Sequence, residues 1–449
     1  MLRKRIQLGL IHVAVAMTLV PINSTLNRVM IKELAISATL VALLASLPYL
    51  FSPIQVAIGS YSDRHPFFGL RRTPYILAGL LLCVLGVILS PKVAFLMSEN
   101  LGLGILAGIG AFGAWGMGYN LSSVSYLSLA SELSGEDGRG KTIATMWFMM
   151  IVSIIGTAIG ISHMVDPYTP EAMMRAFEIV GASALFLGLL GLLWLEPRVK
   201  VDSAKVQAET YTVKQMISAI LDNPVAKLFF IYLLLLLAAL LGQDVLLEPF
   251  AAEAFGMSVT ETTRITSLWG TFVLVAIIIA GFMEGRLSAV RAGSTSNTPV
   301  RDGKRIVAQT GNLGALAGFI VIVVSGFTSS LGIFYTGVTL LGIGTGLSTV
   351  ANLSLMFDLT VAGNVGLYIG AWGFSNAMSR LTGSLLGGIV RDGVTQATGQ
   401  ALSGYLVVFG IEAAMLAAAA IILARIDVSA FKQKAAEPSF VEKVALAAE

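Results

Sequence analysis

Three polar side chains near one end of a long apolar stretch are the residues of this sequence best placed to do chemistry. The stretch runs over residues 228–250 and contains Gln243, Asp244 and Glu248. Ionisable groups at membrane depth are costly, so they face a protein interior or a wet cavity and mark a functional pathway. Carboxylates in such a place gate a cavity or carry protons. The sequence therefore predicts a membrane protein with a polar site.

A second polar patch, PINSTLNR, lies at a similar depth in the first apolar segment and includes Asn23, Asn27 and Arg28. If the chain is built from two pseudo-symmetric halves, the first and seventh spans occupy equivalent positions, and the two patches meet near the midplane. We expect Arg28 to pair with Asp244 or Glu248, and to close the cavity on the non-cytoplasmic side or to anchor a polar ligand group. The alternative is a static bridge between two helices. The predicted cavity site comprises Asn23, Asn27, Arg28, Gln243, Asp244 and Glu248.

Other titratable residues inside apolar segments offer two further sites. Arg380 and Glu412 form a second candidate ion pair. Of the three histidines, only His12 lies well inside a span, where a neutral imidazole could act as a metal ligand. We favour a histidine that is hydrogen-bonded to a neighbouring helix, because nothing near it in the sequence forms a recognisable binding set.

Composition fixes the class of protein that must hold these side chains. The chain is 56% hydrophobic and only 12% charged, which is typical of a polytopic membrane protein and far from the usage of a soluble domain. About 20 apolar residues are needed for each crossing. Twelve segments qualify: about 7–31, 37–61, 73–95, 101–130, 141–164, 175–195, 225–250, 262–283, 307–327, 330–357, 364–389 and 402–424. The predicted fold class is thus an all-α polytopic membrane protein.

Internal similarity at about half the chain length divides these spans into two sets of six. Asn120-Leu121-Ser122 recurs as Asn352-Leu353-Ser354, and each follows a glycine-rich run. We assign these runs to close helix packing, because GIGAFG lacks the preceding strand that a nucleotide-binding loop requires. The predicted domains are an N-terminal half at 1–196, a cytoplasmic linker at 197–223, a C-terminal half at 224–426 and a cytoplasmic tail at 427–449.

The distribution of Lys and Arg sets the orientation. In the twelve-span scheme most of these residues fall on the face that carries the N-terminus, including Arg3, Lys4, Arg5, Arg198 and Lys200. The positive-inside rule then places both termini in the cytoplasm. Because the basic residues are spread over loops rather than gathered on a domain, we expect no nucleic-acid partner, and the bilayer is the expected environment.

The loop between the second and third spans has features of a latch. Gly59, Asp63, Arg64, Arg71 and Arg72 resemble the GxxxDR…GRR signature of the major facilitator superfamily, with extra residues inserted. Glycine allows two helices to approach closely, and Asp63 can accept hydrogen bonds from a helix N-terminus and nearby arginines. The alternative reading is a plain basic turn on the cytoplasmic side. A six-plus-six repeat with a central linker is also the architecture of that superfamily.

Several longer segments carry a more specific resemblance. Read together, they resemble the bacteriochlorophyll delivery family, the PucC and LhaA-like proteins of phototrophs, which is a branch of the major facilitator superfamily. These segments are residues 23–34, 62–76, 126–133, 146–150, 242–266 and 370–392. The resemblance implies an assembly factor that delivers or holds transiently bound chlorophyll or bacteriochlorophyll, or shields apoproteins during pigment insertion. It implies as partners light-harvesting or photosystem polypeptides, with chlorophyll synthase as a further candidate, in a thylakoid or photosynthetic inner membrane. With such a cargo, His12 becomes the possible ligand for the magnesium of the pigment.

Two other functions stay open at this point. One is a proton-coupled secondary transporter of a small solute through a central cavity, with Asp244 or Glu248 as the proton carrier; the other is a membrane scaffold with a collapsed cavity. The sequence contains no HExxH, P-loop or GxSxG motif and a single cysteine, Cys83, so we expect neither an enzyme nor a metal site.

Overall fold

The structure is a computed structural model built of helices. It describes residues 2–52, 61–62, 65–198, 224–292, 303–359 and 365–426, together with residues 54, 58 and 221. The helices of the first part are α1 (Leu2–Met17), α2 (Leu19–Pro21), η1 (Ile22–Leu26), η2 (Val29–Glu33), α3 (Ala38–Ala45), α4 (Leu47–Leu50), α6 (Thr73–Glu99), α7 (Leu101–Met164) and α8 (Pro170–Leu192). Those of the second part are α10 (Pro224–Gly242), η4 (Gln243–Val245), α11 (Leu247–Phe255), α12 (Val259–Ala292), α13 (Gly303–Thr328), α14 (Leu331–Asp358), α15 (Val365–Thr398) and α16 (Ala401–Leu423).

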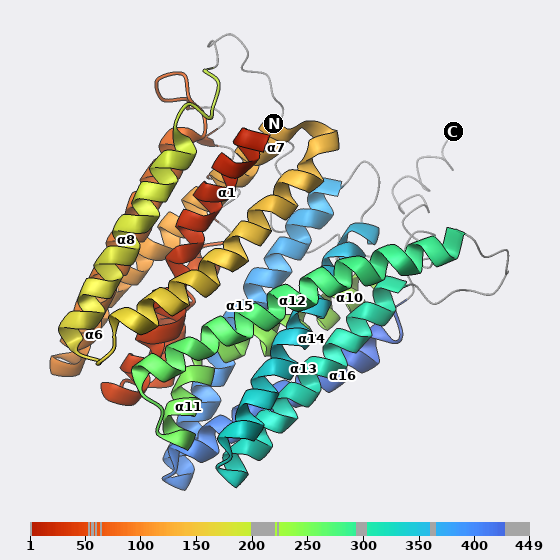
Figure 1. The fold of residues 1–449 in the computed structure, drawn as a ribbon. Coiled ribbons are helices and arrows are strands. Elements are labelled where there is room, and N and C mark those ends of the chain that lie inside the picture. The colour runs from red at the N-terminus through yellow and green to blue at the C-terminus, as the bar shows by residue number, and fades with distance from the viewer. Residues whose placement is uncertain are drawn as a thin grey trace, which may run out of the picture.

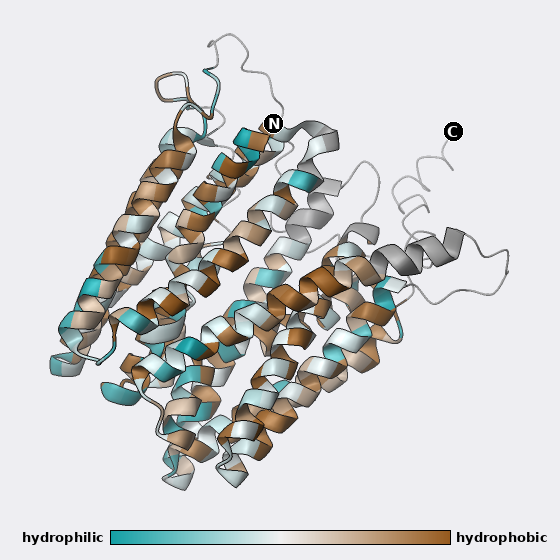
Figure 2. Ribbon diagram, in the orientation of Figure 1, coloured by the Kyte–Doolittle hydropathy of each residue, from teal (hydrophilic) through white to brown (hydrophobic). Residues whose placement is uncertain are grey.

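Within the described residues, ten helical segments are long and apolar enough to cross a membrane. A spanning helix satisfies every backbone hydrogen bond internally, which is why apolar runs of this length fold as helices in lipid. The remaining two predicted spans correspond to α3 with α4 and to α15, where part of the chain or of its side chains lies outside the described set. Brown and pale residues make up most of the long helices in Figure 2. The prediction of an all-α polytopic membrane protein is confirmed.

The helices pack as two groups, which Figure 1 shows side by side. In the first group, α1, α6, α7 and α8 pack against one another, and in the second, α13 packs on α14 and α16, and α10 on α15 and α16. The groups meet where α12 packs on α7 and where α15 packs on α3 and α4. This grouping is what two six-helix halves require. The domain boundaries stay a prediction, because residues 199–220 of the linker and the tail at 427–449 lie outside the described residues.

Local signals set several helix boundaries. Gly135 has a φ of 64° and breaks α7 into the two predicted spans, a conformation that glycine adopts without the cost of a Cβ. Asn100 accepts a hydrogen bond from the Leu103 amide at 3.1 Å, and Thr169 accepts one from the Ala172 amide at 3.0 Å. Both are side-chain caps of helix N-termini.

Two departures from regular α-helix coincide with the two polar patches. The first span turns π-helical over η1 and η2, and the seventh is interrupted by the short 3₁₀ turn η4 between α10 and α11. The predicted span at 225–250 thus changes from α-helix to a 3₁₀ turn at Gln243. Irregular backbone at membrane depth occurs where it is buried in protein or lines a cavity, and π-bulges are frequent at functional sites.

Candidate functional site

An ion pair between Asp244 and Arg380 forms the centre of the polar site. Asp244 Oδ2 lies 3.7 Å from Arg380 Nη1, and Gln243 Nε2 donates to Asp244 Oδ1 at 2.8 Å. Arg380 Nη1 also donates to the Tyr49 hydroxyl at 3.0 Å, and its guanidinium lies over the Tyr49 ring, 5.2 Å from the centroid. The Arg380 and Asp244 side chains are 30% and 27% exposed, so neither is completely covered by its neighbours.

This pairing corrects two predictions. Asp244 does not pair with Arg28, and Arg380 does not pair with Glu412. The break at η4 turns Asp244 toward α15, where Arg380 lies, while α4 supplies the aromatic hydroxyl. The packing of α15 on α3 and α4 therefore decides which partner each charge receives.

Arg28 is buried, and its contacts go to its own span and to the segment just before α12. It forms an ion pair with Glu33, and its Nη2 donates to the Met257 carbonyl at 3.0 Å. The physical reason is the π-helical turn of η2, in which residues five apart stack on one another. Asn27 donates to the Asn23 carbonyl at 3.1 Å within the same span. Of the predicted cavity residues on the first span, Arg28 is thus the one with a hydrogen bond to another element.

Glu248 is held by hydroxyl groups from two other helices. Its Oε1 accepts a hydrogen bond from Ser24 of η1 and one from Thr266 of α12, the latter at 2.6 Å. Nearby, the Thr25 and Thr263 hydroxyls lie 3.2 Å apart. The two polar patches are joined by the hydrogen bond from Ser24 to Glu248, rather than by Asn23, Asn27 or Arg28. In a sequence these hydroxyls give no signal that separates them from ordinary packing residues.

Further polar contacts join the two helix groups at one end of the bundle. We call this the distal end, which carries the connections at 34–37, 165–169, 256–258 and 399–400. Lys32 pairs with Glu253, and Asp392 accepts from the backbone amides of Ala38 and Thr39 at 3.1 and 2.8 Å. These contacts link η2 to α11 and α3 to α15.

At the opposite end, glutamates organise the start of α6. Glu196 accepts hydrogen bonds from the backbone amides of Arg71, Arg72 and Thr73 at 2.6–2.9 Å, and so caps the helix. Arg72 pairs with Glu132 at 2.9 Å. The predicted latch residues Gly59, Asp63 and Arg64 lie outside the described residues, so the latch itself stays a prediction. Sequence reasoning missed both glutamates, which lie far from the loop in the chain.

His12 is buried in an aromatic setting. Its ring lies 5.2 Å from that of Tyr126 and 6.0 Å from that of Trp147, centroid to centroid. Within the described part of the chain, Nδ1 has no hydrogen-bond partner. The favoured reading, a histidine hydrogen-bonded to a neighbouring helix, thus has no such contact at Nδ1 and stays a prediction.

A groove between α7, α12 and α14 has room for a ligand. Its volume is about 370 Å³, within the usual range for small-molecule sites. Apolar side chains and hydroxyls surround two basic groups, His163 and Arg264. The lining includes Ile159, Ser162, Leu268 and Tyr335. Sequence reasoning placed His163 at the far end of a span and passed over it. Only the packing of α7 on α12 brings it to the groove.

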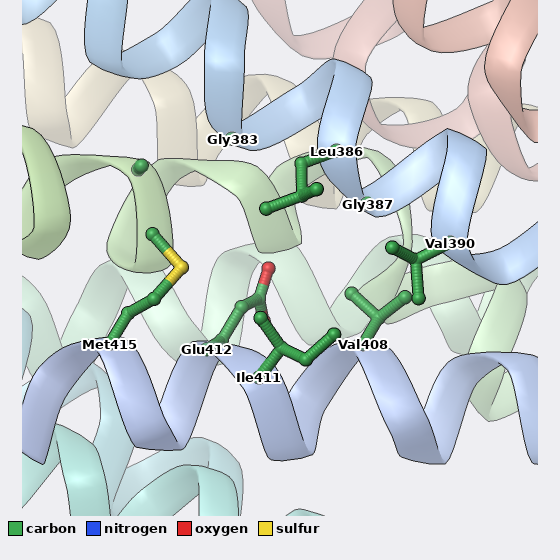
Figure 3. Close-up of a pocket in the computed structure, with 9 residues that line it drawn as sticks. Gly383, Leu386, Gly387, Val390, Val408, Ile411, Glu412 and Met415 are labelled. Carbon is green, nitrogen blue, oxygen red and sulfur yellow. The ribbon is translucent and has the colours of Figure 1, made fainter.

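Glu412 occupies a separate, small cavity of about 10 Å³. Figure 3 shows its carboxyl projecting from α16 toward α10 and α15 among aliphatic side chains such as Leu386, Val390 and Val408. The residue is only 4% exposed. Elsewhere in the described ranges, no group of three histidine, cysteine or acidic residues could hold a metal ion.

Comparison with known proteins gives a consistent picture. The family model described as PUCC protein matches residues 25–431. The chain is 30% identical to Protein PucC of Rhodobacter capsulatus, over 92% of this chain and 90% of that protein. It is 31% identical to Protein PucC of Cereibacter sphaeroides over the same shares of the two chains. It is also 28% identical to the Bacteriochlorophyll synthase 44.5 kDa chain of Rhodobacter capsulatus, over 86% of each.

Solved structures show the fold. A bacterial homologue of the human lysosomal transporter Spinster, inward-facing and unoccupied, gives a TM-score of 0.70 at 13% identity, over 97% of this chain and 98% of that chain. A D-xylose–proton symporter gives 0.69 at 13% identity, over 94% and 97%. At identities this low, the structural similarity shows the fold alone. It confirms the predicted major facilitator superfamily architecture.

Proposed function

Since the chain belongs to the PUCC protein family, we propose that it is an assembly factor for chlorophyll-binding light-harvesting or photosystem complexes. The observation that carries this proposal is the match over residues 25–431, which takes in nearly every helix of the fold. One relative is named as a bacteriochlorophyll synthase chain, which supports a place close to pigment supply. The protein delivers or holds (bacterio)chlorophyll, or shields apoproteins while pigment is inserted, and it does no chemistry on the pigment itself.

The groove beside His163 is the site that suits a pigment best. A chlorophyll offers a magnesium ion that takes one axial ligand, a flat apolar ring and polar substituents at its edge. Neutral imidazole is a general metal ligand, and His163 is the histidine that lines the groove. Ile159 and Leu268 give apolar walls, while Arg264 and Tyr335 offer donors to edge carbonyls. This donor set supports His163 as the pigment ligand, whereas the ring of His12 lies against Tyr126 and Trp147.

We further propose that both termini lie in the cytoplasm and that the membrane is a photosynthetic inner membrane or thylakoid. The excess of Lys and Arg on the N-terminal side of the predicted topology supports this orientation. The distal end, with His163 and Arg264, then lies on the non-cytoplasmic side. Partners are the chlorophyll-binding polypeptides, with the chlorophyll synthase as a further candidate.

The test is gentle purification of the tagged full-length protein from a phototroph's own membranes, with an absorption spectrum and mass spectrometry of what accompanies it. We expect stoichiometric pigment together with light-harvesting or photosystem polypeptides. A second tagged transporter of the same fold from the same membranes controls for pigment that partitions into any detergent micelle. A colourless, solitary protein would contradict the proposal.

A proton-coupled transporter is the second candidate, and one observation favours it. Asp244 and Arg380 form a partly exposed charge pair within the spanning region of a transporter fold. Charges of this kind are costly in membranes and usually mark an ion or substrate pathway. Reconstituted vesicles distinguish the two: saturable solute uptake that collapses with the proton gradient favours transport, and its absence with retained pigment binding favours assembly.

A further inference from the structure

The carboxyl group of Glu412 is isolated in the middle of a spanning helix. Glu412 lies at the centre of α16 (Ala401–Leu423), and its residue surface is 4% exposed. Its cavity is bounded by Ala238 of α10, by Gly383, Leu386 and Gly387 of α15, and by apolar residues of α16 (Figure 3). Glu412 Oε2 has no hydrogen-bond partner among the described residues, and no described cation lies within ion-pair distance.

Small residues create the space that the carboxyl fills. A Cβ at position 242 would lie 3.0 Å from Glu412 Oε1, and a Cβ at Gly383 would lie 2.3 Å from the Ala238 carbonyl oxygen. The two glycines therefore allow α10 and α15 to approach each other and leave one pocket beside the carboxyl. The cavity of about 10 Å³ holds one water at most.

Several charged groups on the surrounding helices are engaged elsewhere; on α15, Arg391 pairs with Asp392. Arg380 of α15 is bound by Tyr49 and Asp244. Of the two glutamates on α11, Glu248 accepts from Ser24 and Thr266, and Glu253 pairs with Lys32. On α13, Arg305 donates to the carbonyl of Ala424 at the end of α16. Asp244 lies two residues beyond Gly242, which borders the Glu412 carboxyl, so its negative charge disfavours a second one there.

A carboxylate in this position would be an uncompensated buried charge. Such a charge costs so much that the group takes up a proton instead. An apolar side chain of the same volume would be cheaper than a neutral carboxylic acid with no partner. A membrane helix retains an acid under these conditions when the acid has a use.

We propose that Glu412 is a proton-binding site at mid-membrane, whose proton exchanges against the guanidinium of Arg380. Residues 380, 383 and 387 lie on one face of α15, because positions three and four apart are neighbours on a helix. Arg380 therefore projects from the same face that borders the Glu412 cavity. In the conformation described here, Arg380 pairs with Asp244 and Glu412 is neutral. When Arg380 turns to Glu412, Glu412 gives up its proton and the released Asp244 takes one up. The three residues together therefore carry no net charge in either state.

This inference goes beyond the proposed function and does not depend on it. Cargo release and solute transport both need a conformational cycle, and the exchange gives either cycle a coupling to the proton gradient. The experiment below therefore uses the purified full-length protein in nanodiscs without pigment, so that its failure is independent of any pigment result.

A hydrophobic carbodiimide adds to a protonated carboxyl in an apolar site and leaves a stable adduct on the residue. We expect an adduct on the peptide that contains Glu412, with a yield that falls as the pH rises, and its loss in Glu412→Gln. Glu171, an exposed residue in the first turn of α8, is the internal control and should react with a water-soluble carbodiimide instead. Infrared spectroscopy gives a second measurement, a protonated-carboxyl band that disappears in Glu412→Gln. Absence of both the adduct and the band overturns the proposal.

The exchange with Arg380 is tested by the pH at which half the adduct is lost. Arg380→Gln removes the competing cation, so the half-loss should shift to higher pH. Asp244→Asn removes the repelling charge and frees Arg380, so the half-loss should shift to lower pH. The same half-loss pH in all three proteins would overturn the exchange.

Discussion

Arg380 and Asp244 stand 3.7 Å apart at the junction of η4 and α15, close enough to attract each other but too far for a direct hydrogen bond. Each charge has a second neutral partner, Tyr49 for the arginine and Gln243 for the aspartate. The pair is thus held loosely, with both side chains partly exposed. A tightly closed structural bridge would show direct, bidentate contact instead.

This geometry predicts a moderate coupling energy. Each of Arg380→Gln and Asp244→Asn should destabilise the folded protein, and the double variant should recover about 0.5–3 kcal/mol relative to the sum of the two. Thermal unfolding of all four proteins in the same nanodiscs measures the cycle. Strict additivity would contradict the pair.

Arg28 should matter more for stability than Lys32, although both carry cations at the distal end. Arg28→Ala removes the donor to the buried Met257 carbonyl and should lower the free energy of unfolding by about 1.5–3 kcal/mol, as for hydrogen bonds to charged groups. Lys32→Ala removes a partly exposed pair with Glu253 and should cost less than about 1 kcal/mol. Equal losses for the two variants would show that the Met257 contact contributes nothing.

Gly86 should be sensitive to a single added methyl group. A Cβ there would lie 2.5 Å from the Cβ of Trp115 and 2.7 Å from the Ala111 carbonyl oxygen, so Gly86→Ala must push α6 away from α7. We expect a loss of about 1–3 kcal/mol, as for overpacking in a core. Gly113 on α7 has no atom within 4 Å of its added Cβ.

Gly113→Ala is therefore the matched control, and it should be neutral or should stabilise by about 0.4–1 kcal/mol through the unfolded state. Unfolding of both variants in one detergent provides the comparison. Similar behaviour of the two alanines would refute the close contact between α6 and α7.

Glu196 should hold the start of α6 in place. Its two oxygens accept from three backbone amides, whereas the amide of Glu196→Gln has a single acceptor oxygen, so we expect a loss of about 0.5–2 kcal/mol, as for other caps. The local readout is the rate at which trypsin cleaves after Arg71 and Arg72. Glu132→Gln breaks a pair whose acid is 47% exposed and should change that rate little. Unchanged cleavage in Glu196→Gln would argue against the cap.

His163 and His12 give opposite predictions for pigment binding. If His163 supplies the axial ligand, His163→Leu should weaken pigment binding at least about tenfold, the smaller effect seen when even a supporting group of a metal ligand is lost. His12→Leu should leave binding unchanged, because His12 lies among aromatic rings away from the groove. Absorption of pigment that co-purifies with each variant, per mole of protein, is the measurement. The reverse result would restore His12 as the ligand.

The class of fold and the place of the polar site along the chain follow from the amino-acid sequence alone. Apolar runs of spanning length can satisfy their backbone only as helices in lipid, so counting them predicts the helices. Gln243, Asp244 and Glu248 stood out because charges are rare and costly in such runs. Both arguments depend on residue type and local spacing alone.

Which residues contact one another, by contrast, depends on how the helices pack. Whether Asp244 faces Arg28, Arg380 or Glu412 depends on the break at η4 and on how α15 is rotated against α3 and α4. Close approach at glycines such as Gly383 sets those rotations, and contacts between helices distant in sequence leave no local pattern. For the same reason the sequence shows His163 only as a residue at the end of a span; it lines the groove because α12 packs against α7.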